Sequence, residues 1–331
     1  MKMNGPSWVT AVVHVASQLT HRWFPLLWQS DQEPEDWLGR VLKNIEDIRC
    51  FPKCERLQLI EALLVDSLSG LRWLGVYLES KGIDAQLISE SLSRHLTELS
   101  EQGGHYVLQT DVHYPSSLKE ISHPPAAISY LGCMPFSGPS CIPISIVGSR
   151  KASAVALQLA EDCGAVLAAA GWEIVSGGAF GCDIAAHYGT LRVASDRAHT
   201  TVVFAGGLDR FHPNFHADLF RKLKSKAACF ISERLWWQTA RPFDFIERNR
   251  IISGLSPVTI LIEAPVKSGA LATCRHALEQ GREVLVWKGM HDDVRSEGNR
   301  KLVSDGAKCF QNVGDLIVKL KSCERGFAEV V

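Results

Sequence analysis

The residues best suited to hold a ligand are small or basic, and they come directly after apolar, β-rich segments. Gly148-Ser149-Arg150 follows the apolar run 144–147, and Ser153 then opens a helical stretch. Free backbone N–H groups at a helix N-terminus, a hydroxyl and a guanidinium fork are the donors that bind anions. This segment therefore predicts a phosphate site containing Gly148, Ser149 and Arg150.

Two further glycine clusters follow the next apolar segments. They contribute Ser176, Gly177, Gly178, Phe180, Gly206, Gly207 and Arg210. Glycine lets a backbone approach a ligand closely, although a tight strand-to-helix turn needs glycine whether or not anything binds there. Phe180 could stack on a nucleic-acid base or equally fill an apolar seam. Three clusters at successive strand ends favour a phosphate-binding crevice.

Two later segments add basic candidates, which are Arg248, Asn249, Arg250, Lys267, Ser268 and Gly269. Arginines two positions apart on a helix point in different directions, so at least one of Arg248 and Arg250 is expected to be structural, paired with Glu263 or Asp209. Ser268 and Gly269 open a helix that can hold phosphate, but plain helix capping explains Ser268 nearly as well.

Enzyme chemistry has little support in the sequence. Asp183 is expected to cap a helix and His187 to be a hydrogen-bonded helix histidine, so no catalytic residue is predicted. A GxGxxG sequence followed by an acid at dinucleotide spacing is absent, and so is a Walker GKS/T sequence. Among ten cysteines, Cys50 and Cys54 are closest and lack the partners of a zinc site. We predict no cofactor and no metal.

The elements that position these residues alternate between short apolar strands and helices. Strands are expected at 144–147, 172–176, 200–205, 229–232, 258–263 and 283–287, and helices at 153–170 and 269–280. Each of these helices is followed by a glycine suited to a left-handed C-terminal position. Alternation of this kind predicts an α/β fold, a doubly wound and mostly parallel Rossmann-like sheet covered on both faces. Ligands of such sheets bind at the carboxyl ends of strands.

The domain organisation divides into three parts. Residues 1–103 hold five of the nine tryptophans and show helical spacing of apolar residues, for which packing between helices is a better explanation than recognition of a partner. We predict a helical N-terminal region at 1–103, the Rossmann domain at 104–312, and a C-terminal helix and tail at 313–331.

Composition limits the class of protein. A chain of 331 residues with 46% hydrophobic and 21% charged residues can bury a sizeable core. The net charge of −1 means that any nucleic-acid site must be a local basic patch. No apolar run reaches the roughly 20 residues of a membrane span. We expect a cytoplasmic protein with reduced cysteines and no membrane association.

The segment 245–256 and the strand that follows it resemble the DprA/Smf family of DNA-processing proteins. The resemblance spans about residues 104–310 through many motifs in order. Matching segments are 114–118, 131–132, 148–150, 176–177, 183, 186–187, 206–209, 213, 263–264, 267–273, 277–284, 298–299 and 306–307. The resemblance implies a Rossmann-like fold, binding of single-stranded DNA, dimerisation, and loading of a RecA-type recombinase during DNA uptake and recombination.

Several positions depart from the family pattern. Phe180 stands where the family usually has a basic residue, Ile246 replaces a proline before the arginines, and Lys288 replaces a proline after the sixth strand. No C-terminal winged-helix domain is expected.

A second hypothesis is a nucleotide sensor or an enzyme similar to the LOG phosphoribohydrolases, which share this type of sheet. Glu263 and Asp209 are the acids at strand ends that could serve it, but the PGGxGT sequence of those hydrolases is absent.

Overall fold

The structure is a computed structural model that describes residues 85–109, 111–134, 142–194, 198–209, 217–225, 228–289 and 293–327. Most of the helical region predicted at 1–103 lies outside these residues. The chain divides into two compact units, Met1–Tyr114 with Pro125–Ile128, and Pro115–Pro124 with Ser129–Val331. The domain boundaries predicted at 103/104 and 312/313 stay predictions.

The described part of the first unit contains helix α5 (Ala85–Glu101) and strand β1 (His105–Leu108). Leu92 and Leu99 on α5 are buried, and the ring of His95 meets the ring of Tyr106 edge-on with centroids 5.1 Å apart. The hydroxyl of Tyr114 donates a 2.6 Å hydrogen bond to the carbonyl of Pro125, which ties the two segments of this unit together.

The second unit is built on a sheet whose order is β2-β6-β5-β4-β3-β7-β8-β9. From Ser129 onward, β2 pairs antiparallel with β6, while the other neighbours pair parallel. The strands are β2 (Ala127–Leu131), β3 (Pro143–Val147), β4 (Glu173–Ser176), β5 (Thr200–Phe204), β6 (Cys229–Ser232), β7 (Val258–Leu261), β8 (Glu283–Trp287) and β9 (Lys308–Phe310). The central strands are almost entirely buried, as their unbroken apolar sequences require.

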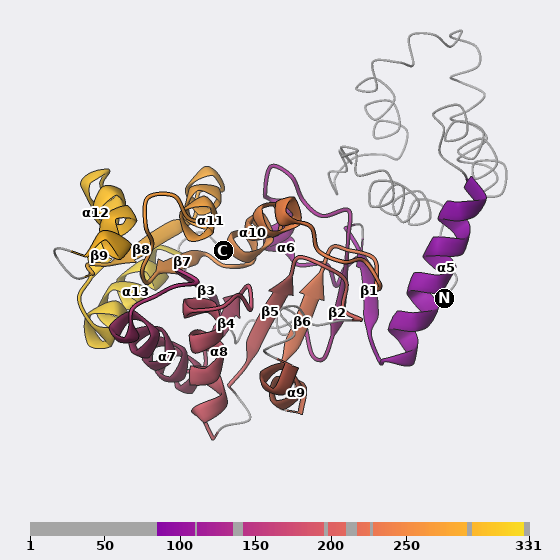
Figure 1. The fold of residues 1–331 in the computed structure, drawn as a ribbon, viewed down its shortest axis with the longest axis horizontal. Coiled ribbons are helices and arrows are strands. Elements are labelled where there is room, and N and C mark those ends of the chain that lie inside the picture. The colour runs from indigo at the N-terminus through magenta and orange to yellow at the C-terminus, as the bar shows by residue number, and fades with distance from the viewer. Residues whose placement is uncertain are drawn as a thin grey trace, which may run out of the picture. The chain divides into compact units, whose positions relative to one another are not determined.

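Helices cover both faces of this sheet (Figure 1). Helices α7 and α8 pack together on one face and α10 and α11 on the other. The remaining helical segments are short or peripheral. The bounds are α6 (Ser116–Lys119), α7 (Ala154–Ala169), α8 (Cys182–Arg192), α9 (Ala217–Ser225), α10 (Pro242–Leu255), α11 (Gly269–Glu279), η4 (Val294–Ser296), α12 (Glu297–Ser304) and α13 (Val313–Phe327). The predicted doubly wound α/β fold is confirmed.

The direction of the connections reverses at β3. The chain passes from β3 to β4, β5 and β6 on one side, and then returns to β7 on the other side of β3. Connections that leave two adjacent strands in opposite directions open a crevice at their carboxyl ends, where ligands of open α/β sheets bind. The three glycine turns follow β3, β4 and β5, which run parallel, so all three lie at that edge.

Among the described helices, none combines the length and the apolar composition needed to cross a membrane.

Candidate functional site

A pocket of about 570 Å³ lies at the carboxyl ends of β3 and β7, the point where the connections reverse. The turn after β3, the start of α11 and one side of α10 form its walls. Eight of the predicted site residues line it, namely Gly148, Ser149, Arg150, Arg248, Asn249, Lys267, Ser268 and Gly269.

The turn after β3 is held by Glu263, which follows β7. The N–H of Ser149 donates to the Glu263 carbonyl at 2.6 Å, and Ser153 donates through its N–H and its hydroxyl to the Glu263 carboxylate at 2.7 and 2.9 Å. Ser153 also caps α7, because its hydroxyl accepts the N–H of Ala156 at 3.1 Å. Glu263 therefore organises the pocket wall, and it pairs with neither of the arginines predicted for it.

Arg150 presents its guanidinium to the pocket. Its side chain is exposed and lies over the ring of Phe245, 5.3 Å from the centroid. In the described part of the chain, no carboxylate forms an ion pair with it. The cation–π contact restricts the side chain without occupying its N–H donors. Arg150 is thus oriented and keeps its donors for an anion.

Arg248 is buried in the floor of the pocket. Its Nη1 donates to the carbonyl of Val203 at the end of β5, and a Cβ on Gly177 would collide with the same nitrogen. Burial lowers the pKa of Arg248 to about 10. The charge of Asp183 raises this pKa and the charge of Arg150 lowers it further. Because a side chain at position 177 would collide with Arg248, packing accounts for the glycine at this position.

Asp183, in the first turn of α8, also lines the pocket and is 6% exposed. Its Oδ2 accepts the N–H of Gly177 at 3.2 Å. Burial raises the pKa of Asp183 to about 6, although the charge of Arg248 and backbone N–H groups lower it. The Asp183 carboxyl thus ionises at higher pH than an exposed aspartate.

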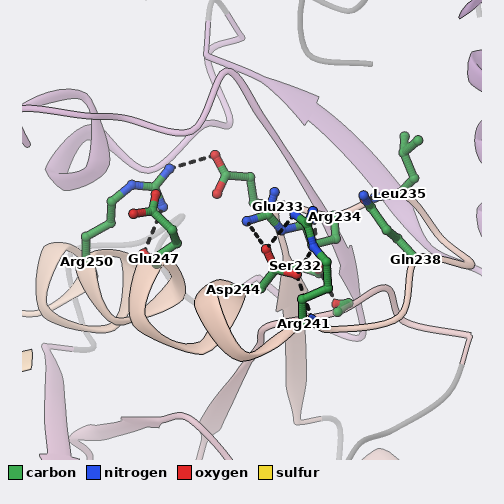
Figure 2. A network of polar contacts seen from close by, with 10 residues as sticks. Ser232, Glu233, Arg234, Leu235, Gln238, Arg241, Asp244, Glu247 and Arg250 are labelled. Carbon is green, nitrogen blue, oxygen red and sulfur yellow. Dashed lines mark hydrogen bonds and ion pairs between the residues drawn. The ribbon is translucent and has the colours of Figure 1, made fainter. Parts of the chain in front are cut away.

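Arg250 does not line the pocket and belongs to a polar network that also holds the start of α10 (Figure 2). Its Nη2 pairs with Glu233 at 2.7 Å, and its Nη1 donates to the Glu247 carbonyl at 3.3 Å. In the same network Asp244 is held by Arg234 at 3.0 Å and Arg241 at 3.1 Å. The expectation that at least one arginine of the pair is structural therefore fits Arg250, although its partner is Glu233.

Of the described residues in the second and third glycine turns, Ala179 alone lines the pocket. Ser176 donates its hydroxyl to the Ile146 carbonyl at 2.6 Å, Gly178 is buried, and Phe180 is 41% exposed outside the pocket lining. Gly206 and Gly207 pack against the segment 233–241. Arg210 lies outside the described residues.

The third glycine turn is closed by the protein's own backbone. The N–H of Gly207 donates to the Gln238 carbonyl at 2.7 Å, and a Cβ on Gly207 would collide with the Trp236 oxygen. A Cβ on Gly206 would lie 2.9 Å from both Ala240 N and the Gln238 oxygen. These contacts explain the two glycines without a ligand.

The start of α11 forms the opposite wall. Ser268 caps this helix, since its hydroxyl accepts the N–H of Leu271 at 3.3 Å. Asn249 on α10 donates through Nδ2 to the Gly269 carbonyl at 3.2 Å, which links α10 to α11. Lys267 is exposed at the rim. The wall therefore combines a helix N-terminus with one cation.

We expect Ser268→Ala to lower the free energy of unfolding by about 1 kcal/mol, since it removes the cap of α11. Ser268→Thr keeps a hydroxyl acceptor and should retain most of the stability. Chemical denaturation of the three proteins measures this difference. Equal stability of the alanine variant and the parent would exclude the capping role.

Twelve residues that line the pocket were not among those predicted to bind the ligand, and three of them bear on its charge or on Arg150, namely Lys151, Phe245 and Asp183. Lys151 is next to Arg150, so its position could have identified it. Phe245 lies against Arg150, and Asp183 interacts electrostatically with Arg248. These partners are distant in sequence, so no local pattern reveals them.

Comparison with known proteins places this site in a family. The family model described as DNA recombination-mediator protein A matches residues 105–321. The chain is 34% identical over 207 residues to Protein Smf of Borreliella burgdorferi, covering 62% of this chain and 63% of that protein. It is 34% identical over 229 residues to DNA processing protein DprA of Bacillus subtilis, covering 69% and 75%.

A solved structure of DNA processing protein A from Streptococcus pneumoniae is similar in fold, with a TM-score of 0.66, 25% identity, and coverage of 96% of this chain and 98% of that one. The protein of the same name from Helicobacter pylori, whose structure is described in terms of its single-stranded DNA binding mode, gives a TM-score of 0.58 at 24% identity and covers 66% and 96%. The family match covers most of the described second unit, including every described wall of the pocket. The chain belongs to the DNA recombination-mediator protein A family.

Proposed function

We propose that this protein binds single-stranded DNA through phosphates held in the pocket and catalyses no reaction on the strand. The observation that carries the proposal is Arg150, an oriented guanidinium with donors uncommitted to any described carboxylate, at the reversal point of the sheet. A guanidinium fork binds phosphate bidentately, and the H. pylori relative is described as binding single-stranded DNA.

The proposed contacts follow the walls of the pocket. Arg150 and Lys151 approach a phosphate from the turn after β3, and Lys267 and the N-terminus of α11 approach it from the other side. These cations form a local basic patch on a chain whose net charge is −1. Phosphates lie inward and the bases stay accessible to a partner.

Two partner relations extend this proposal through family membership. A protein that leaves bases accessible could present them to a RecA-type recombinase, and we propose that it assists recombinase loading in DNA uptake and recombination. We also propose that it acts in the cytoplasm as a homodimer.

The two strand-end acids of the nucleotide-hydrolase alternative are not placed to serve it. Glu263 is buried and its carboxylate accepts two hydrogen bonds from Ser153. Asp209 belongs to the third glycine turn, whose described residues do not line the pocket. Neither of these two acids therefore favours N-glycosidic cleavage over binding.

Titration with single-stranded oligonucleotides of increasing length, their duplexes and a mononucleotide competitor tests the function. Affinity should rise with strand length and fall with salt, because the protein binds successive phosphates. Under the proposed function it should also exceed the affinity for duplex. Preferential retention of the mononucleotide with release of free base would instead identify the hydrolase.

A further inference from the structure

The floor of the pocket holds a carboxylate where the proposed ligand is an anion. Asp183 lines the pocket and is 6% exposed, and it lies on the same floor as Arg248. A negative charge close to bound phosphate opposes binding, and it does so strongly where burial reduces solvent screening. The expectation that Asp183 caps a helix is wrong, because the N-cap of α8 is Gly181 and no side chain caps this helix.

We propose that Asp183 sets the anion affinity of the pocket, lowering it when the carboxyl is ionised and raising it when the carboxyl is protonated. Asp183 is a positioning residue in this proposal, because it acts through Arg248 and through the turns after β3 and β4. The inference rests on the proposed binding of single-stranded DNA.

The contacts of Asp183 support this role. The N–H groups of Gly148, Gly177 and Ala179 form hydrogen bonds to its carboxyl, so that it joins the turns after β3 and β4. Arg248 packs against Gly177 and interacts electrostatically with Asp183. The charge of Asp183 therefore offsets the charge of Arg248, and Arg150 is left as the exposed arginine of the pocket.

Asp183 titrates at a pH at which binding can be measured. Burial raises the pKa of this carboxyl to about 6, with Arg248 and the backbone donors opposing the increase. The carboxyl is ionised above that pH and neutral below it. Bound phosphate disfavours the ionised form further, so binding should be accompanied by proton uptake near this pH.

Other charged groups around α8 are engaged elsewhere. On α7, Glu161 and Asp162 face Arg192 at the far end of α8, and on α9 the exposed Asp218 pairs with Arg221. Glu263 lies beside Cys182 and is bound by Ser153, and Glu173 at the start of β4 is bound by Thr201. On α8 itself, His187 contacts Thr200 through Nδ1. No histidine lines the described pocket.

The test measures affinity for a single-stranded oligonucleotide at about pH 7.5 and about pH 5.5, at constant ionic strength. Asp183→Asn should bind about fivefold more tightly than the parent at the higher pH, the size expected for removal of one nearby charge. The difference should disappear at the lower pH, because the parent carboxyl is then protonated. Asp162→Asn removes one exposed carboxylate away from the pocket and should follow the parent at both pH values.

The pH profile of the parent protein gives a second measurement that needs no variant. Its affinity should rise as the pH falls between these values, with a midpoint near 6, and Asp183→Asn should lose that rise. A flat parent profile, or the same rise in Asp183→Asn, overturns the proposal even if the variant is poorly folded.

A parallel experiment with sulfate in place of DNA separates this inference from the proposed function. Sulfate keeps its charge over this pH range. The rise in Tm that sulfate causes in the parent, minus the rise that it causes in Arg150→Ala, measures anion binding at the pocket. One outcome is that the protein does not bind DNA, while sulfate stabilises it in a pH-dependent way that Asp183→Asn abolishes. This outcome would reject the DNA function and support the role of Asp183. If the protein binds DNA but neither DNA binding nor the sulfate effect depends on pH through Asp183, only the role of Asp183 is rejected.

Discussion

Arg150→Ala is expected to weaken single-strand binding by about 1–3 kcal/mol, the range for removal of a charge-assisted hydrogen bond that leaves its partner unpaired. The logarithmic slope of affinity against salt concentration should fall by about 0.7 for each phosphate that the variant no longer neutralises. Arg150 lies over Phe245 and forms no described ion pair, so the substitution removes one exposed cation–π interaction and should change stability little. Fluorescence anisotropy across a salt series measures both binding quantities.

Two further variants control this experiment. Arg150→Lys should recover only part of the affinity, because an ammonium cannot reproduce the planar fork. Arg221→Ala removes an exposed arginine that pairs with Asp218 on α9, outside the pocket lining, and should bind as the parent does. If Arg150→Ala stays folded and keeps both the parent affinity and the parent salt slope, the pocket is not the DNA site.

Glu173→Gln is expected to abolish a large pH dependence of stability. Glu173 is fully buried at the start of β4, where its Oε1 accepts the hydroxyl of Thr201, and burial raises its pKa to about 8 against the effect of that hydrogen bond. The neutral carboxyl therefore stabilises the folded protein. This contribution is fully present below pH 4.5, the ordinary pKa of the group, and is lost as the pH rises through the folded-state pKa of about 8. In this window the parent should lose about 1.4 kcal/mol per pH unit from this residue.

Chemical denaturation between pH 5 and pH 8.5 measures the effect as the difference between parent and variant. The glutamine amide remains neutral and keeps an acceptor for Thr201, so the variant should lack this component of the slope. Glu297→Gln changes an exposed carboxyl on α12 and should reproduce the parent curve. Parallel curves for Glu173→Gln and the parent would show that Glu173 is already ionised in the folded protein.

Six strands of the sheet, β3 to β8, could be predicted from the sequence because they are short apolar runs separated by turn residues, whereas β2 and β9 were not predicted. The strands at Cys229–Ser232 and Glu283–Trp287 have the predicted bounds, whereas β7 ends at Leu261, two residues before the predicted end at Glu263. The difference arises at Glu263, whose carboxylate binds Ser153 beyond the end of the strand ladder.

The candidate site was predictable only in part. The turn after β3 and the start of α11 reach one pocket because topology places them at adjacent strand ends, which the alternation of elements indicates. The role of the other glycines could not be predicted, because it depends on tertiary neighbours. Gly177 makes room for Arg248, and Gly207 makes room for Trp236, residues with no local relation to them in the sequence.

The segment 233–241, which covers Gly206 and Gly207 and also anchors the start of α10 through Asp244, has a consequence for the footprint on DNA. An extended strand leaving the pocket along the carboxyl edge towards β5 would meet this backbone and would have to displace it. The path of the strand is then confined to the interval between Arg150 and Lys267 or must leave the sheet edge. A copy that keeps the strand within this interval would occlude only a short stretch of nucleotides, and coverage of longer DNA would then grow by adding copies along the strand.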